Sequence, residues 1–385
     1  MILKITGGRI VTSSGYIDGK DIYCENGVIT AITNEECRFD KQIDAGGNFI
    51  SPGFIDLHVH GAVDYDFSAD NEQSAINAVN YHLKHGTTTI YPTITSVPLN
   101  TMDSALGVIE NIIKDQKTPA NVMGAHLEGP YFSPKQAGAQ DPAIITPPKA
   151  EDYNYLLGKY PSVIKRWSFA PELEGTEQFM DALNNASVVA SVAHTDALYS
   201  DVEKVHNKGC KLITHFYSCT STITRDKGFR RLGVIEAGYL MDDMAVEVIA
   251  DGCHIPKELF SLIHKIKGDD NICLVTDAIQ LAGSDNEFAT VGGVPCKVKD
   301  GVARLLDESA FAGSIATTNR LVRFCVNDVK LPLYTAIKMI TKNPAKVMGL
   351  KNKGEIAVGY DADIVIFDND INIKNIIVNG KEVSI

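Results

Sequence analysis

The sequence predicts an α/β protein in which a (β/α)₈ TIM-type barrel carries a small β-sandwich module built from both chain termini. Two observations support this fold class. The chain has 385 residues, which leaves room for a second module beside a barrel of about 250 residues. Its middle alternates short apolar runs with longer helical stretches, whereas both ends consist of short strands and turns.

The two ends of the chain share this strand-and-turn texture. Asn26-Gly27 accepts the positive φ angles of a tight hairpin turn, and Gly7-Gly8 and Gly46-Gly47 mark further turns. We therefore expect one β-sandwich domain from residues 1–52 plus 353–385, and a barrel domain from residues 53–352. The strands expected at the ends cover residues 3–5, 9–11, 21–24, 28–32, 354–356, 362–367 and 376–381.

Between the ends, eight apolar runs alternate with helical stretches, as in parallel strands joined by crossover helices. No GxGxxG motif follows the first run, so a dinucleotide-binding sheet loses its main support. The expected strands are 53–60, 87–92, 121–128, 164–170, 187–194, 211–215, 245–250 and 272–277. Helices are expected at 72–85, 101–114 and 176–184, among others.

Composition limits the class of partner. The formal net charge of −12 argues against nucleic acid or an anionic membrane surface as a partner, but not against a small anionic metabolite. No apolar run approaches the roughly 20 residues of a membrane helix, and the N-terminus lacks a signal-peptide core. The eight cysteines are dispersed without a CxxC pair, which favours a reducing cytoplasm.

Polar side chains end five of the eight expected strands. In a barrel these ends meet at the face that carries the active site. His58 and His60 are two residues apart on the first strand, so they share one face. Imidazoles and carboxylates are the usual ligands of zinc or iron(II), so the joint pattern predicts a metal site. The members of this pattern are His58, His60, Glu128, His194, His215 and Asp277. His82, His85, His206 and His264 lie in helical or loop stretches and are expected to be structural.

Several sequence runs resemble the amidohydrolase superfamily and, within it, the N-acetylglucosamine-6-phosphate deacetylases. The run at 53–61 is similar to the superfamily's first-strand motif, and His126-Leu127-Glu128-Gly129-Pro130 is similar to the deacetylases' most specific signature. The similarity covers nearly the whole chain, in the family's order. Further matching runs are 215–217, 251–254, 275–278, 312–314, 343–345 and 354–363.

The resemblance implies a role for each residue of the pattern. Glu128, His194 and His215 would hold the catalytic metal, and His58 and His60 would supply a second metal position. Asp277 would be the general acid/base and His254 a substrate-binding residue. The implied cofactor is one or two divalent ions per subunit, zinc or iron. The implied reaction removes acetate from N-acetyl-D-glucosamine 6-phosphate by metal-activated water.

The sequence departs from the family where substrate is bound. Some relatives have a carbonyl-polarising His where this chain has Gln140, and many have Asn-Ala-Met where it has Ser218-Cys219-Thr220. The basic stretch 224–231 also differs, and one of Arg225, Arg230 and Arg231 is expected to meet the 6-phosphate because Arg suits that anion. The alternative for any one of them is ordinary surface charge. The resemblance implies a homodimer in which these arginines act on the neighbouring subunit, as in similar enzymes.

Two other functions stay open at this point. One is an amidohydrolase for a different N-acyl amino sugar, an N-acyl-D-amino acid or a cyclic amide. The other is a non-catalytic barrel homologue, against which the complete ligand set and Asp277 argue.

Overall fold

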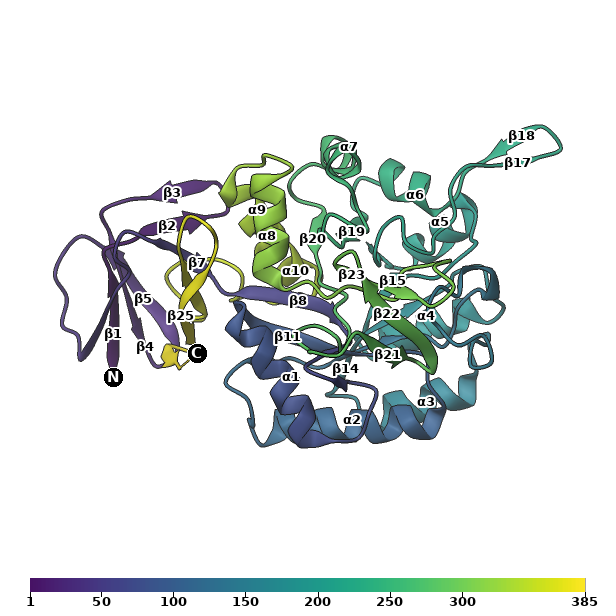
Figure 1. Cartoon of the computed structure of the whole chain (residues 1–385), viewed down its shortest axis with the longest axis horizontal. Helices are drawn as coiled ribbons and strands as arrows, with labels where there is room; N and C mark the ends of the chain where they lie inside the picture. The colour runs from purple at the N-terminus through teal and green to yellow at the C-terminus, as the bar shows by residue number, and fades with distance from the viewer. Residues whose placement is uncertain (385) are drawn as a thin grey trace.

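The computed structural model describes residues 1–384 and divides into a β-sandwich and a barrel. Figure 1 shows the sandwich beside the barrel, with both chain termini in the sandwich. The fold class expected from the sequence is confirmed.

The barrel contains eight parallel strands in sequence order around the ring. The ring closes without a full ladder between its last and first strands: Val59 forms a bridge with Ala278, and the Asp277 N–H donates to the His58 carbonyl over 2.8 Å. The strands are β8 (Phe54–Val59), β11 (Thr87–Ile94), β13 (Ala125–Glu128), β14 (Ile164–Phe169), β15 (Val189–Val192), β16 (Leu212–Ile213), β19 (Ala245–Val248) and β20 (Ile272–Leu274), with β12 (Asn121–Val122) as a short extension beside β11.

A helix follows each barrel strand and covers the outside of the ring (Figure 1). The three helices predicted from the sequence correspond to α1, α2 and α4, with ends that differ by at most two residues. The helices are α1 (Glu72–Lys84), α2 (Leu99–Lys114), α3 (Ala150–Lys159), α4 (Thr176–Asn185), α5 (Tyr199–Asn207), α6 (Val234–Leu240), α7 (Lys257–Lys267) and α8 (Thr318–Asn327), followed by α9 (Leu333–Ile340) and α10 (Lys342–Val347).

The sandwich joins strands from both ends of the chain. One sheet has the order β5-β4-β1-β6 and the other β26-β25-β24-β7-β2-β3. Apolar side chains of the two sheets, such as Ile5, Ile10 and Ile364, form one buried core. The strands are β1 (Ile2–Thr6), β2 (Arg9–Thr12), β3 (Gly15–Ile17), β4 (Asp21–Glu25), β5 (Val28–Thr33), β6 (Lys41–Asp44), β7 (Phe49–Pro52), β24 (Ile364–Phe367), β25 (Ile373–Val378) and β26 (Lys381–Val383).

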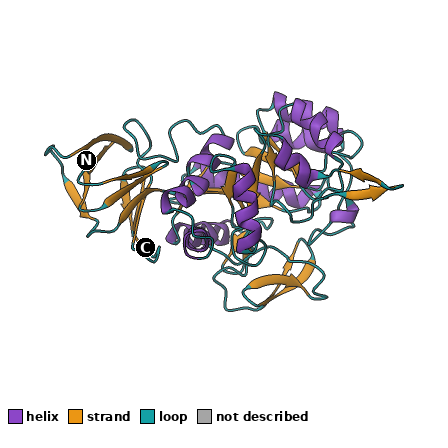
Figure 2. Ribbon diagram, turned by 90° about the horizontal axis from the view of Figure 1, so that it is seen from above, coloured by secondary structure: helices purple, strands orange, loops and turns teal. Residues whose placement is uncertain are grey.

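Three additions to the barrel were not expected. A small hairpin, β9 (Gly61–Ala62) and β10 (Tyr65–Asp66), follows the first strand. A hairpin of β17 (Thr224–Asp226) and β18 (Phe229–Arg231) projects from the barrel at the far right of Figures 1 and 2. A three-stranded antiparallel sheet, β21 (Phe288–Val291), β22 (Val294–Lys299) and β23 (Val302–Leu305), lies between β20 and α8.

Within residues 1–384, no helix has the length and apolar character needed to cross a membrane.

Candidate active site

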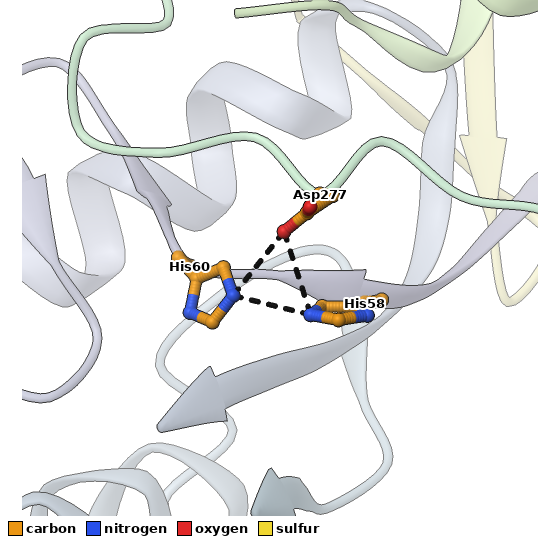
Figure 3. A group of neighbouring side chains, drawn as sticks. All are labelled: His58, His60 and Asp277. Atoms are coloured by element: carbon orange, nitrogen blue, oxygen red, sulfur yellow. Dashed lines mark hydrogen bonds and ion pairs between the residues drawn. The ribbon is translucent and has the colours of Figure 1, made fainter. Parts of the chain in front are cut away.

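The first group of possible metal ligands consists of His58, His60 and Asp277 (Figure 3). The Nε2 atoms of the two histidines are 3.1 Å apart. Asp277 Oδ1 lies 3.4 Å from His58 Nε2 and 3.2 Å from His60 Nε2. The histidines come from the end of β8 and Asp277 follows β20, so the group forms where the ring closes.

The second group consists of Glu128, His194 and His215, which follow or end β13, β15 and β16. Glu128 Oε1 lies 3.0 Å from His215 Nε2 and 3.4 Å from His194 Nε2. The two imidazole Nε2 atoms are 3.1 Å apart. The structure thus brings together all six side chains that the sequence pattern picked out.

Glu128 lies between the two groups. Its Oε1 faces the second group and is 3.4 Å from His58 Nε2, while its Oε2 is 3.3 Å from His60 Nε2. Burial opposes the charged carboxylate, but the positive charge of His58 and hydrogen bonds from His194 and His215 hold the pKa of Glu128 well below its usual range. A single buried carboxylate therefore contacts both groups.

The other charges of the site depend on one another in the same way. Burial disfavours the imidazolium of His60, yet its contacts with Asp277 and Glu128 raise its pKa to about 10. Burial would raise the pKa of Asp277, but the charge of His58 and the contact with His60 lower it to about 2. The same contacts therefore lower the pKa of the Asp277 carboxyl and raise that of the His60 imidazole.

These residues also fit a metal ion chemically. Facing Nε2 atoms only 3.1 Å apart direct two lone pairs at each other unless one nitrogen carries a proton. An ion bound between them would accept both lone pairs. Each group offers three ligand atoms within 4.8 Å of one another, of the nitrogen and oxygen types that zinc and iron(II) accept.

Three of the six residues leave their strands in a left-handed backbone conformation. The φ angles are 43° for His194, 28° for His215 and 48° for Asp277. Such angles are uncommon outside glycine and cost about 1–3 kcal/mol each. They turn the side chains into the barrel mouth at the point where β15, β16 and β20 have already ended. At these three positions the observed strands end before the runs expected from the sequence.

A cavity of about 300 Å³ opens above the two groups. The three-stranded sheet and the segment after it form one wall, with Val291 and Phe311 among the lining side chains. Gly313 packs so closely that a Cβ there would meet the Asp277 carbonyl oxygen at 2.8 Å. The residues predicted from the sequence that line the cavity are His60, Glu128, Gln140, His194, His215, Ser218, Cys219, His254 and Asp277.

His254 is held at the cavity wall by a carboxylate. Its Nδ1 lies 2.9 Å from Asp251 Oδ2, and its ring lies 4.7 Å from that of Phe311. Because Asp251 engages Nδ1, Nε2 is the ring nitrogen left to meet a ligand.

The sequence interpretation missed cavity residues on the second strand and in the inserted sheet. Thr95 lies just beyond β11, which continues to Ile94 rather than ending at residue 92 as expected. The polar pair Thr95-Ser96 after an apolar run was the signal that could have found it. Val291 and Phe311 offered no comparable signal, because single apolar residues in an irregular stretch resemble any packed loop.

The structure does not bring the three arginines to this cavity. Arg225, Arg230 and Arg231 lie on the β17–β18 hairpin, where every residue is exposed. Arg231 pairs with Asp226 of the same hairpin over 3.1 Å. Among the described side chains that line the cavity, none is a lysine or an arginine. Among the described residues, the basic side chains that line the cavity are therefore histidines.

The four histidines expected to be structural lie outside the cavity lining. His82 Nε2 is 2.9 Å from the Gly61 carbonyl oxygen, and burial lowers its pKa to about 4. His206 contacts Asp243 over 2.7 Å, and His264 contacts Asp269 over 2.6 Å. His85 packs against the ring of Tyr81.

Comparison with known proteins agrees with this geometry. Residues 49–383 match the amidohydrolase family. The chain belongs to the amidohydrolase family. This amidohydrolase is 30% identical over 389 residues to the N-acetylglucosamine-6-phosphate deacetylase of Bacillus subtilis (strain 168). The aligned residues cover 98% of this chain and 96% of that protein.

Two solved structures resemble the amidohydrolase over essentially its full length. N-acetylglucosamine-6-phosphate deacetylase from Pasteurella multocida gives a TM-score of 0.93 at 28% identity, over 100% of both chains. A mutant N-acetyl-D-glucosamine-6-phosphate deacetylase from Mycobacterium smegmatis, in complex with N-acetyl-D-glucosamine-6-phosphate, gives 0.89 at 25% identity, over 99% of this chain and 98% of that one. The resemblance seen in the sequence is confirmed.

Proposed function

We propose that this amidohydrolase removes the acetyl group from N-acetyl-D-glucosamine 6-phosphate, releasing acetate and D-glucosamine 6-phosphate. The observation that carries the proposal is the junction at Glu128: one carboxylate contacts two groups of buried ligands at the floor of a cavity that also holds Asp277. The full-length similarity to deacetylases of this phosphosugar supports the substrate.

We propose that Glu128, His194 and His215 hold a catalytic divalent ion, zinc or iron, and that His58 and His60, beside Asp277, provide the position for a second. Such an ion lowers the pKa of a coordinated water from 15.7 toward about 7 and polarises a carbonyl oxygen. In this proposal Glu128 would lie between the two positions, since its Oε1 is 3.0 Å from His215 Nε2 and its Oε2 is 3.3 Å from His60 Nε2.

Asp277 is the proposed general acid/base. As water attacks the acetamide carbon, the Asp277 carboxylate takes one of its protons. The carbon–nitrogen bond then breaks, and Asp277 returns that proton to the sugar nitrogen. The free amine leaves, and the second water proton leaves with acetic acid, which ionises to acetate. The position of Asp277 supports this role, because its carboxylate lines the cavity and its Oδ1 lies 3.2 Å from His60 Nε2.

The substrate's polar groups are assigned to the upper cavity. We propose that His254, Ser218 and Cys219 contact the sugar phosphate, and that a homodimer brings Arg225, Arg230 or Arg231 of one subunit to the cavity of the other. The absence of lysine and arginine from the cavity lining of one described chain supports a contribution from a second subunit. The eight unpaired cysteines support a cytoplasmic enzyme.

Steady-state kinetics would test the function directly. Acetate release should be measured from N-acetylglucosamine with and without the 6-phosphate, from the 4-epimer N-acetylgalactosamine 6-phosphate, and from an N-acyl-D-amino acid. We expect the highest kcat/KM for N-acetylglucosamine 6-phosphate. A higher value for the epimer or for the amino acid would assign the site to that substrate instead, and no acetate from any of them would favour a non-catalytic homologue.

A further inference from the structure

Gln140 lines the cavity at the place where the sequence comparison suggested a contact with the substrate carbonyl. It follows the short 3₁₀ helix η1 (Pro134–Gln136), and its backbone N–H donates to the Ala137 carbonyl over 2.9 Å. Its side chain is nevertheless almost completely buried, at 4% exposure. The amide group therefore has fixed neighbours within the protein.

These neighbours determine which way the amide points. The Ser96 backbone N–H can only donate, and it lies 3.0 Å from the Gln140 oxygen Oε1. The Thr95 hydroxyl donates to the same oxygen over 2.8 Å. Reversing the amide would place its NH₂ group against the Ser96 N–H, which leaves two donors facing each other. The hydrogen bonds from Thr95 and Ser96 therefore determine which end of the Gln140 amide is the oxygen and which is the nitrogen.

With Oε1 fixed, Nε2 faces Glu128. It donates to Glu128 Oε2 over 2.8 Å, the carboxylate oxygen that also faces His60. A donor to a carboxylate makes a strong, charge-assisted hydrogen bond, and here both partners are buried. The link runs from the end of β11 through Gln140 to the end of β13.

We propose that Gln140 is a positioning residue for Glu128 rather than a substrate contact. By holding Oε2, it sets the rotation of the carboxylate, so that Oε1 points at His194 and His215 while Oε2 stays beside His60. This inference rests on the proposed metal site, but it does not depend on which amide the enzyme hydrolyses. Polarisation of the substrate carbonyl is then left to the proposed metal positions.

The test compares metal affinity with turnover in Gln140→Met, which keeps the side-chain length and removes the amide. Metal-free full-length protein would be titrated with Zn²⁺ against a coloured chelator, and kcat and KM would be measured at saturating Zn²⁺. Loss of such a supporting contact typically costs 10–100-fold in metal affinity or activity. We expect Zn²⁺ to bind about 10–100-fold more weakly, with KM changing much less. Gln73→Met, on the exposed face of α1, is the matched control and should bind Zn²⁺ like the parent.

A second variant keeps the test decisive if Gln140→Met does not fold. Thr95→Val removes one of the two hydrogen bonds that fix Oε1 and preserves the shape of the residue. Thr95→Val should also weaken Zn²⁺ binding, by a smaller factor than Gln140→Met. Unchanged Zn²⁺ affinity in a folded Gln140→Met protein whose turnover or KM is impaired would overturn the inference and make Gln140 a substrate contact. A parent protein that binds Zn²⁺ but deacetylates nothing would refute the proposed function and leave the role of Gln140 testable. The Zn²⁺ affinities of the parent and of Gln140→Met could still be compared.

Discussion

The six side chains at the barrel mouth and the arginines of the β17–β18 hairpin differ in burial and in the contacts that hold them. Every ligand candidate is buried and contacts at least two others, because the ends of β8, β13, β15, β16 and β20 converge on one point. Arg225, Arg230 and Arg231 are exposed on the β17–β18 hairpin. The acidic partner of Arg231, Asp226, lies on the same hairpin. One chain therefore brings the six candidate ligands together but does not bring the arginines to the cavity.

This difference separates two parts of the proposed reaction. The chemistry of bond cleavage depends on groups that a single barrel positions. Recognition of the phosphate is proposed to depend in part on arginines that one chain does not bring to its own cavity. Variants of the six side chains at the barrel mouth should therefore lose turnover with every substrate. Variants of the hairpin arginines should lose turnover only with a phosphorylated substrate, and only if the hairpin of one subunit reaches the cavity of the other.

The largest effect is expected from Glu128→Gln. The amide cannot supply the negative charge that both ligand groups share, so bound metal should fall and turnover should be almost abolished, while the circular dichroism spectrum is retained. Elemental analysis of the purified variant measures the metal, and Glu177→Gln on the exposed surface is the control. Unchanged metal content would remove Glu128 from the site.

A smaller loss is expected from Asp277→Asn. The variant keeps the side-chain shape but has no base to accept a proton, so kcat should fall by about 10²–10⁴-fold, the usual contribution of a positioned acid/base. KM should change little, because the cavity contacts remain. Asp181→Asn on the exposed surface of α4 serves as the control, and activity within a few-fold of the parent would contradict the assignment.

The smallest effect is expected from the hairpin, and it depends on the substrate. Replacing the responsible arginine by Ala should raise KM for the 6-phosphate about 10–100-fold, because a hydrogen bond to a charged group contributes about 1.5–3 kcal/mol. The unphosphorylated sugar should be hydrolysed as before. Arg38→Ala, an exposed residue of the sandwich, is the control.

A mixed dimer would sharpen the comparison further. An Asp277→Asn subunit with intact arginines, paired with an arginine variant that keeps Asp277, has one complete site only if the hairpin acts across the dimer. Recovery of phosphosugar turnover on mixing would support that arrangement. If all three single arginine variants keep the parental preference for the phosphate, the hairpin has no part in recognition.

The sequence predicted the barrel and its ligand groups because both follow from local rules. Apolar runs of strand length, separated by helical stretches, identified all eight barrel strands. Residues at the ends of parallel strands must meet at one face, so Glu128, His194 and Asp277 were placed together without knowledge of any contact. The sandwich followed from the matching texture of the two ends, while its boundaries at residues 52 and 353 remain a prediction.

Contacts between residues far apart in the sequence could not be predicted from these local patterns. No local pattern distinguishes an amide that faces a substrate from one that faces Glu128; only the approach of the Ser96 N–H, 44 residues away along the chain, decides the orientation of Gln140. The β21–β23 sheet was missed because its strands have only four to six residues and their apolar side chains are interrupted by polar ones such as Thr290, Lys297 and Arg304, so no continuous apolar run marks them.

The pairing of β7 with β24 has a consequence for biosynthesis. Phe49 pairs with Phe367, so about 300 residues are translated between the two strands. At roughly 5–20 residues per second, the nascent chain carries β7 with one unpaired edge for about 15–60 s. The barrel strands emerge during that interval and need no help from the last strands to find their neighbours. The sandwich can therefore be completed only after the barrel strands have been synthesised, and until then the β7 edge stays exposed.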